Sequence, residues 1–115
     1  MTLEECYAQM GADYAAVLKR FYKPEMILRF VKLFPADTSF QQLKDAMAAG
    51  DVKEAFRAAH TLKGVAMNLG FANLGKTASE LTEALRGGKE LKDMNLLTAV
   101  EKAQEELKEA LEGLE

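Results

Sequence analysis

A single histidine in the middle of a helix-forming stretch is the first residue of this chain that could do chemistry. His60 is the only histidine among 115 residues. Around it, apolar residues recur at alternating steps of four and three, which is typical of one buried face of an α-helix. These residues are Ala55, Ala59, Leu62, Ala66 and Leu69. His60 lies well away from that face, so we expect its imidazole to point outward.

The neighbours of His60 suit phosphoryl transfer. Imidazole is largely neutral at physiological pH, so a ring nitrogen can attack an acyl phosphate and then carry the phosphoryl group. Lys63 lies on the same side of the helix and can offset part of the phosphoryl charge. Gly64 is unusual, because glycine inside a helix costs about 1 kcal/mol relative to alanine. Such a glycine usually allows a close approach, here by the phosphoryl group and the surface that delivers it.

These residues resemble the signature of histidine phosphotransfer (HPt) domains. The resemblance is carried by His60-Thr61-Leu62-Lys63-Gly64, by Asn68-Leu69-Gly70 and by Leu74. HPt domains are helical bundles that pass phosphoryl groups between receiver domains in bacterial phosphorelays. The resemblance implies that His60 accepts a phosphoryl group from a receiver phospho-aspartate and passes it to another receiver, assisted by Lys63 and Gly64.

The same resemblance implies the partners of the chain. We expect response-regulator receiver domains and a hybrid histidine kinase to bind it, and we expect a phosphocarrier without its own ATP site rather than an enzyme. No cofactor is expected, because the family places the magnesium ion on the receiver. One histidine and one distant cysteine also cannot supply the clustered ligands of a usual zinc site.

Four residues around His60 are candidates for the surface on which a receiver docks. Phe56 and Met67 share the His60 side of the helix, and Lys53 and Arg57 lie at its rim. Exposed apolar groups ringed by charge commonly mark partner sites. The sequence leaves an alternative open, which is that a neighbouring helix covers Phe56 and Met67.

Helical periodicity extends along the whole chain and predicts an all-α fold. Capping residues and helix breakers divide the chain into helices over about 3–10, 14–21, 25–34, 40–49, 52–70, 72–86 and 93–114. Short turns between such helices predict an antiparallel up-down four-helix bundle. We expect one domain over 1–115, with extra short N-terminal helices in about 1–35 covering one end of a bundle formed by about 37–114.

Composition excludes several classes of protein. Hydrophobic residues make up 49% and charged residues 29% of the chain, as in ordinary globular domains. The net charge is −3 without a basic cluster, so we expect no nucleic-acid binding. No apolar run approaches the roughly 18 residues of a membrane span, and the acidic start is unlike a signal peptide. With a single cysteine, Cys6, and no feature that demands a dimer, we expect a cytoplasmic monomer.

Two other functions compete with the phosphocarrier. The segment Gly70-Phe71-Ala72-Asn73-Leu74-Gly75-Lys76-Thr77 matches the P-loop pattern of nucleotide-binding proteins. A P-loop follows a buried strand, and no strand is predicted here, so we interpret the match as chance. A helical adaptor that binds a receiver or kinase without accepting phosphate would use the same face as the carrier, and only the effect of losing His60 would separate the two.

Overall fold

Helices account for most of residues 1–114, the part of the chain that the structure describes, and this part contains no β-strand. The N-terminal helices are α1 (Leu3–Gln9), α2 (Tyr14–Phe21) and α3 (Pro24–Leu33), followed by the 3₁₀ turn η1 (Phe34–Ala36). The later helices are α4 (Ser39–Ala49), α5 (Val52–Asn68), α6 (Ala72–Leu85) and α7 (Asn95–Glu112), with the 3₁₀ turn η2 (Arg86–Gly88) after α6. This computed structural model confirms the predicted all-α class.

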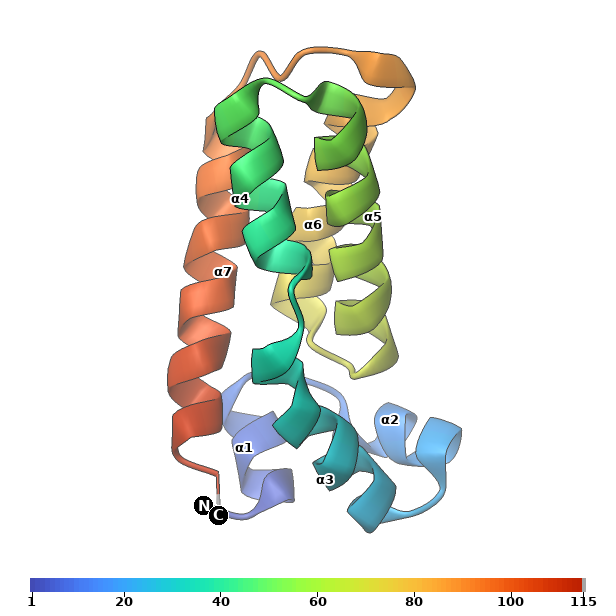
Figure 1. The fold of residues 1–115 in the computed structure, drawn as a ribbon. Helices are drawn as coiled ribbons and strands as arrows, with labels where there is room; N and C mark the ends of the chain where they lie inside the picture. Colours follow the sequence, from blue (N-terminus) through green and yellow to red (C-terminus); the bar gives the residue numbers. More distant parts are fainter. Residues whose placement is uncertain (115) are drawn as a thin grey trace.

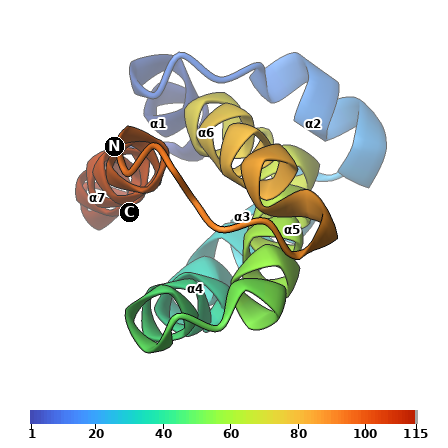
Figure 2. The same ribbon diagram turned by 90° about the horizontal axis from the view of Figure 1, so that it is seen from above.

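Helices α4 to α7 form an up-down four-helix bundle (Figure 1). Each helix runs antiparallel to the one before it, and the four surround a common core when seen from above (Figure 2). Helix α5 packs against α4 and α6, and α6 packs against α7. Only residues 50–51 join α4 to α5 and residues 69–71 join α5 to α6. Such short connections force consecutive helices to be neighbours, which explains the predicted architecture.

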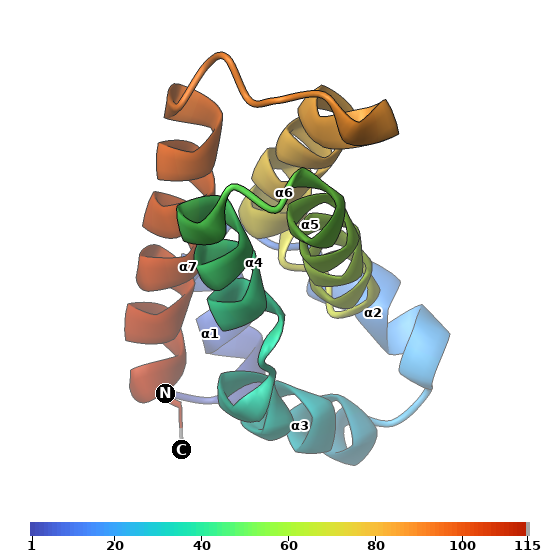
Figure 3. The same ribbon diagram turned by 45° about the horizontal axis from the view of Figure 1, so that its top comes forward.

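The three N-terminal helices gather at one end of the bundle, where α5 turns into α6 (Figures 1 and 3). Helices α2 and α3 pack together as a hairpin, and α1 contacts both α2 and α7. The thiol of Cys6 donates to the carbonyl of Ala110 at 3.5 Å, which links α1 to the last helix. The N-terminal helices therefore cover one end of the bundle.

Local hydrogen bonds set the ends of the helices. Asp51 accepts a hydrogen bond from the backbone N–H of Glu54 at 3.2 Å and so caps the start of α5. Gly50 closes α4 in the left-handed conformation, with a φ of 71°. Asp93 was the predicted start of the last helix, but its carboxylate accepts from the N–H of Asn95 at 3.0 Å, so the helix begins two residues later.

The joint between α5 and α6 is fixed by the N-terminal helices. Gly70 adopts a φ of +74°, and a Cβ at this position would lie 2.3 Å from Cγ2 of Val17 in α2. The Tyr7 hydroxyl donates to the carbonyl of Leu69 at 2.6 Å. The Arg20 guanidinium donates to the backbone carbonyls at the end of α5. The Leu69-Gly70 part of the sequence signature therefore has a structural role in this chain.

Replacing Tyr7 with phenylalanine tests this joint. The carbonyl of Leu69 would lose its buried donor, so we expect the free energy of unfolding to fall by about 1–2 kcal/mol. Burial also raises the pKa of Tyr7, so the folded protein keeps the phenol neutral while the unfolded chain ionises it above about pH 10. The stability of the native protein should therefore fall as the pH rises above about 10, and more steeply than that of Tyr7→Phe.

Denaturant unfolding at several pH values between 7 and about 11 measures both effects. Tyr22→Phe is the matched control, because the Tyr22 side chain is 84% exposed and should contribute little to either effect. Equal pH slopes for the native protein and Tyr7→Phe would show that ionisation of the Tyr7 phenol does not cause the loss of stability at high pH.

Candidate functional site

His60 lies in the middle of α5, and its side chain is exposed. The predicted apolar face of the helix is buried in the bundle: Ala59 is 0% and Leu62 is 1% exposed. Because that face is fixed in the core, the opposite side of the helix, with the imidazole, points to solvent. The sequence prediction for the orientation of this residue is confirmed.

The imidazole contacts Phe56, and Phe56 in turn contacts Arg86. The ring of Phe56, one turn earlier in α5, lies nearly parallel to that of His60, with 11° between the planes and 6.1 Å between the centroids. The guanidinium of Arg86 lies over the Phe56 ring at 5.3 Å from its centroid, a cation–π contact. Arg86 also donates two hydrogen bonds to Glu83, at 2.8 and 2.9 Å. The C-terminal end of α6 thus supports the aromatic ring that contacts His60.

Glu83 brings a carboxylate close to the histidine. Hydrogen bonds from Arg86 lower the pKa of Glu83, and the charges of Arg86, Lys63 and His60 act in the same direction. The carboxylate therefore stays ionised at neutral pH. A phosphoryl group on His60 would meet a face that carries both positive and negative charge.

Lys63 and Gly64 lie on this same side of α5. Lys63 is half-buried and makes no ion pair within residues 1–114, so its ammonium group is available to a ligand. A Cβ added to Gly64 would meet no other side chain within 4 Å in this part of the chain. Packing inside the protein therefore does not require glycine at position 64.

The four predicted docking residues differ in exposure. Met67 is 48% exposed, and a Cβ on Gly75 of α6 would lie 3.1 Å from its Cγ, so the alternative that a neighbouring helix covers it holds in part. Phe56 is half-buried against the arginine of η2, so the alternative that neighbouring structure covers it holds in part. Lys53 and Arg57 are exposed, and Arg57 pairs with Glu54 at 2.7 Å. Their contact with a receiver stays a prediction.

Sequence reasoning missed Glu83 and Arg86. They lie in α6 and η2, more than 20 residues after His60, and reach the histidine face only because α6 returns alongside α5. The only local signal was their spacing of three residues, which is typical of helical ion pairs and does not point to a site.

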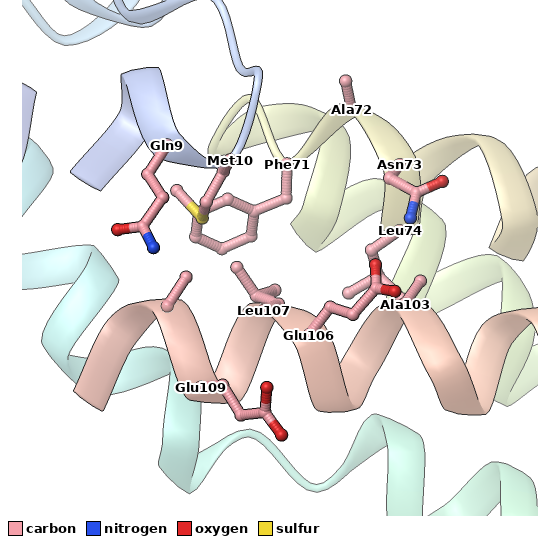
Figure 4. Close-up of a pocket in the computed structure, with 11 residues that line it drawn as sticks. Gln9, Met10, Phe71, Ala72, Asn73, Leu74, Ala103, Glu106, Leu107 and Glu109 are labelled. Carbon is pink, nitrogen blue, oxygen red and sulfur yellow. The ribbon is translucent and has the colours of Figure 1, made fainter. Parts of the chain in front are cut away.

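A hollow lies away from the histidine, between α1, the start of α6 and α7 (Figure 4). Its volume is about 290 Å³. The lining residues are Gln9, Met10, Phe71, Ala72, Asn73, Leu74, Ala103, Glu106, Leu107, Glu109 and Ala110. Because neither His60 nor any of the predicted docking residues belongs to this set, the hollow is separate from the candidate site.

The segment that matches the P-loop pattern is not a phosphate-binding loop. Residues 72–77 form the first turns of α6, and no strand precedes them in the described chain. The hydroxyl of Thr77 donates to the carbonyl of Leu74 at 3.1 Å within the helix. A Cβ on Gly75 would lie 3.1 Å from Cγ of Met67, so glycine at this position allows α6 to approach α5.

Comparison with protein families gives a match over most of the chain. The model of the Hpt domain matches residues 33–115, which include η1 and all four helices of the bundle. This chain belongs to the Hpt family. Hpt domains carry out histidine phosphotransfer in phosphorelays, where they interact with receiver domains and kinases. Searches of curated proteins and of solved structures gave no match.

Two further findings concern membranes and metals. Among residues 1–114, no helix combines the length and the apolar character that crossing a bilayer requires. In the same residues, no three His, Cys, Asp or Glu side chains come together where they would hold a metal ion.

The two glycines of the signature predict opposite effects on stability. Gly64→Ala should raise the free energy of unfolding by about 0.5–1 kcal/mol, because it favours the helix and meets no side chain. Gly70→Ala should lower it by about 2 kcal/mol or more, because it combines a positive φ with a steric clash. Denaturant unfolding measures both changes. A destabilised Gly64→Ala variant would contradict the open surroundings of Gly64.

Proposed function

We propose that this Hpt protein accepts a phosphoryl group on His60 from a receiver phospho-aspartate and passes it to a second receiver. The observation that carries the proposal is the exposed imidazole in the middle of α5, with Lys63 and the bare Gly64 on the same side. The family match supports the same role for the chain.

The proposed reaction is a direct displacement. The lone pair of a His60 ring nitrogen attacks phosphorus, a nitrogen–phosphorus bond forms, and the bond from phosphorus to the aspartate oxygen breaks. The electron pair of that bond stays on the aspartate, which leaves as a carboxylate. Lys63 offsets the charge of the phosphoryl oxygens. Magnesium would come with the receiver, and transfer to the second receiver is the reverse of this step.

Two features of this chain would prepare His60 for the attack. The Phe56 ring lies against the imidazole and restricts its rotation, which helps to align the ring nitrogen with the acyl phosphate. Gly64 leaves space one turn from His60, where the receiver must approach closely enough for its aspartate to reach the ring. Phe56 would thus position the imidazole, and Gly64 would leave room for the receiver.

The chain would act as a carrier within a longer relay. We expect a hybrid histidine kinase to supply phosphoryl groups through its receiver, and we expect the chain to work as a cytoplasmic monomer. The docking surface would include Lys53, Phe56, Arg57 and Met67. The competing function is an adaptor that binds a receiver through the same face without accepting phosphate.

Substitution of His60 distinguishes the carrier from the adaptor. Receiver domains from the same genome, labelled on aspartate, should transfer label to the native protein and not to His60→Gln. The label should be labile in acid and stable in base, as expected of phosphohistidine. Because His60 is exposed, helicity and melting temperature should hardly change.

Receiver binding is measured on the same two proteins. Binding that persists in His60→Gln together with loss of label would support the carrier. Binding of receivers with no label on the native protein would favour the adaptor instead.

Gly64→Ala should slow transfer although it stabilises the fold. The added methyl group would hold the receiver away from His60, and a misplacement of about 1 Å can reduce the rate by about 100-fold. We expect transfer at least about tenfold slower, measured by rapid quench with saturating phosphorylated receiver. An unchanged rate would show that position 64 does not contact the receiver.

A further inference from the structure

The hollow between α1, the start of α6 and α7 has no part in the function proposed above. This hollow, which we call the α1–α7 hollow, lies on the surface of the bundle and is shown in Figure 4. Its volume of about 290 Å³ is at the small end of the range for ligand sites, so a molecule of roughly ten non-hydrogen atoms would fit.

The floor of the hollow is apolar and is held in place from behind. Phe71, Leu74 and Leu107 contribute buried side chains to it. Two other rings hold the Phe71 ring inside the protein, with centroid distances of 6.0 Å to Tyr7 and 5.2 Å to Phe34. A ligand on this floor would therefore find a preformed surface and would not have to reorder the core.

Met10 forms the α1 side of the hollow. Its side chain lies against the Phe71 ring in Figure 4, and the residue is half-buried. A methionine side chain has several rotatable bonds and adapts its shape to what it contacts. Met10 can therefore turn aside and pack on the body of a ligand that lies over Phe71.

Polar side chains border the apolar floor. Glu106 extends from α7 toward the start of α6, where Asn73 lies, and Gln9 lies on the α1 side (Figure 4). Glu109 is the second carboxylate of the lining. All four residues are exposed, and neither carboxylate forms an ion pair within residues 1–114. The hollow thus offers negative charge and hydrogen-bond acceptors beside an apolar surface.

The charge of the surrounding helices favours a positively charged ligand. Helix α7 carries five glutamates and two lysines, and α1 carries two glutamates and no basic residue. Among the described residues, no lysine or arginine lines the hollow, and Lys76 of α6 lies outside it. A cleft whose walls carry one sign of charge attracts ligands of the opposite sign. An anionic ligand would be repelled.

We infer that the α1–α7 hollow binds a small organic cation, with its apolar body on the Phe71 ring and its ammonium group at Glu106. The ligand class is a primary amine with an aromatic or branched aliphatic body. An ammonium group has three N–H donors, which suit the Glu106 carboxylate and the amide oxygens of Gln9 and Asn73. The inference does not depend on phosphoryl transfer by His60.

The first experiment titrates the full chain with 2-phenylethylammonium. We expect a Kd of about 1 mM, because so small a ligand makes few contacts. At about 20 mM the amine should raise the melting temperature by at least about 2 °C, because it binds the folded chain. Two compounds with the same ring are matched controls. 2-Phenylethanol should bind at least about threefold more weakly because it lacks the charge, and phenylacetate should not bind.

Two-dimensional NMR of the amide groups locates the ligand. The signals of residues 72–74 and 103–110 should shift with the amine, and those of α4 should not. Glu106→Gln should weaken binding of the amine at least about threefold and leave binding of the alcohol unchanged. Glu105→Gln is the matched control, because Glu105 is exposed on α7 and does not line the hollow. It should bind the amine nearly as tightly as the native protein.

A substitution that fills the hollow tests the apolar part of the site. Ala72 is exposed and lines the hollow, so Ala72→Phe should abolish binding of both the amine and the alcohol. Glu106→Gln decides the matter even where Ala72→Phe lowers the melting temperature. Equal affinities for the amine, the alcohol and phenylacetate would overturn the inference. Native-like binding of the amine by Glu106→Gln, or shifts spread equally over all acidic residues, would also overturn it.

Discussion

Helix α5 must bury one face in the bundle and leave the other uncovered, and the rest of the structure depends on this division. Its buried face consists largely of alanine, with Ala55, Ala59 and Ala66 each 0% exposed. Small side chains let α4 and α6 pack closely on either side of the helix. On the other face, His60 is exposed and Met67 is 48% exposed, so the imidazole is open to solvent while its helix packs in the bundle.

The C-terminal end of α5 is held by residues from distant parts of the chain. Tyr7 and Arg20 both donate to backbone carbonyls at the end of the helix, and Gly70 allows α2 to pack against the turn that follows. Carbonyl groups at a helix end otherwise lack partners, so these donors satisfy them and stop the helix at a defined residue. The same contacts attach α2, and with it the α2–α3 hairpin, to the end of α5.

The histidine face combines contributions with different physical roles. Phe56 provides an aromatic contact, Lys63 a cation that forms no ion pair within residues 1–114, and Glu83 with Arg86 an ion pair. Arg86 contacts both Glu83 and Phe56, and the side chains of the Arg86–Glu83 pair are exposed.

The sequence alone was sufficient to predict the helices and the exposed face of α5, because these depend on local periodicity, caps and side-chain type. The phosphoryl chemistry of His60 stays a prediction from that sequence. The order of α4, α5 and α6 followed as well, since their connections of two and three residues leave little choice, whereas the longer segment 86–94 joins α6 to α7. Only the tertiary structure placed Glu83 and Arg86 beside the histidine, showed that Gly64 is open while Gly70 is packed, and left Phe30 and Leu33 uncovered. Those features depend on contacts between residues far apart in the chain, and local sequence patterns do not indicate which distant side chains meet.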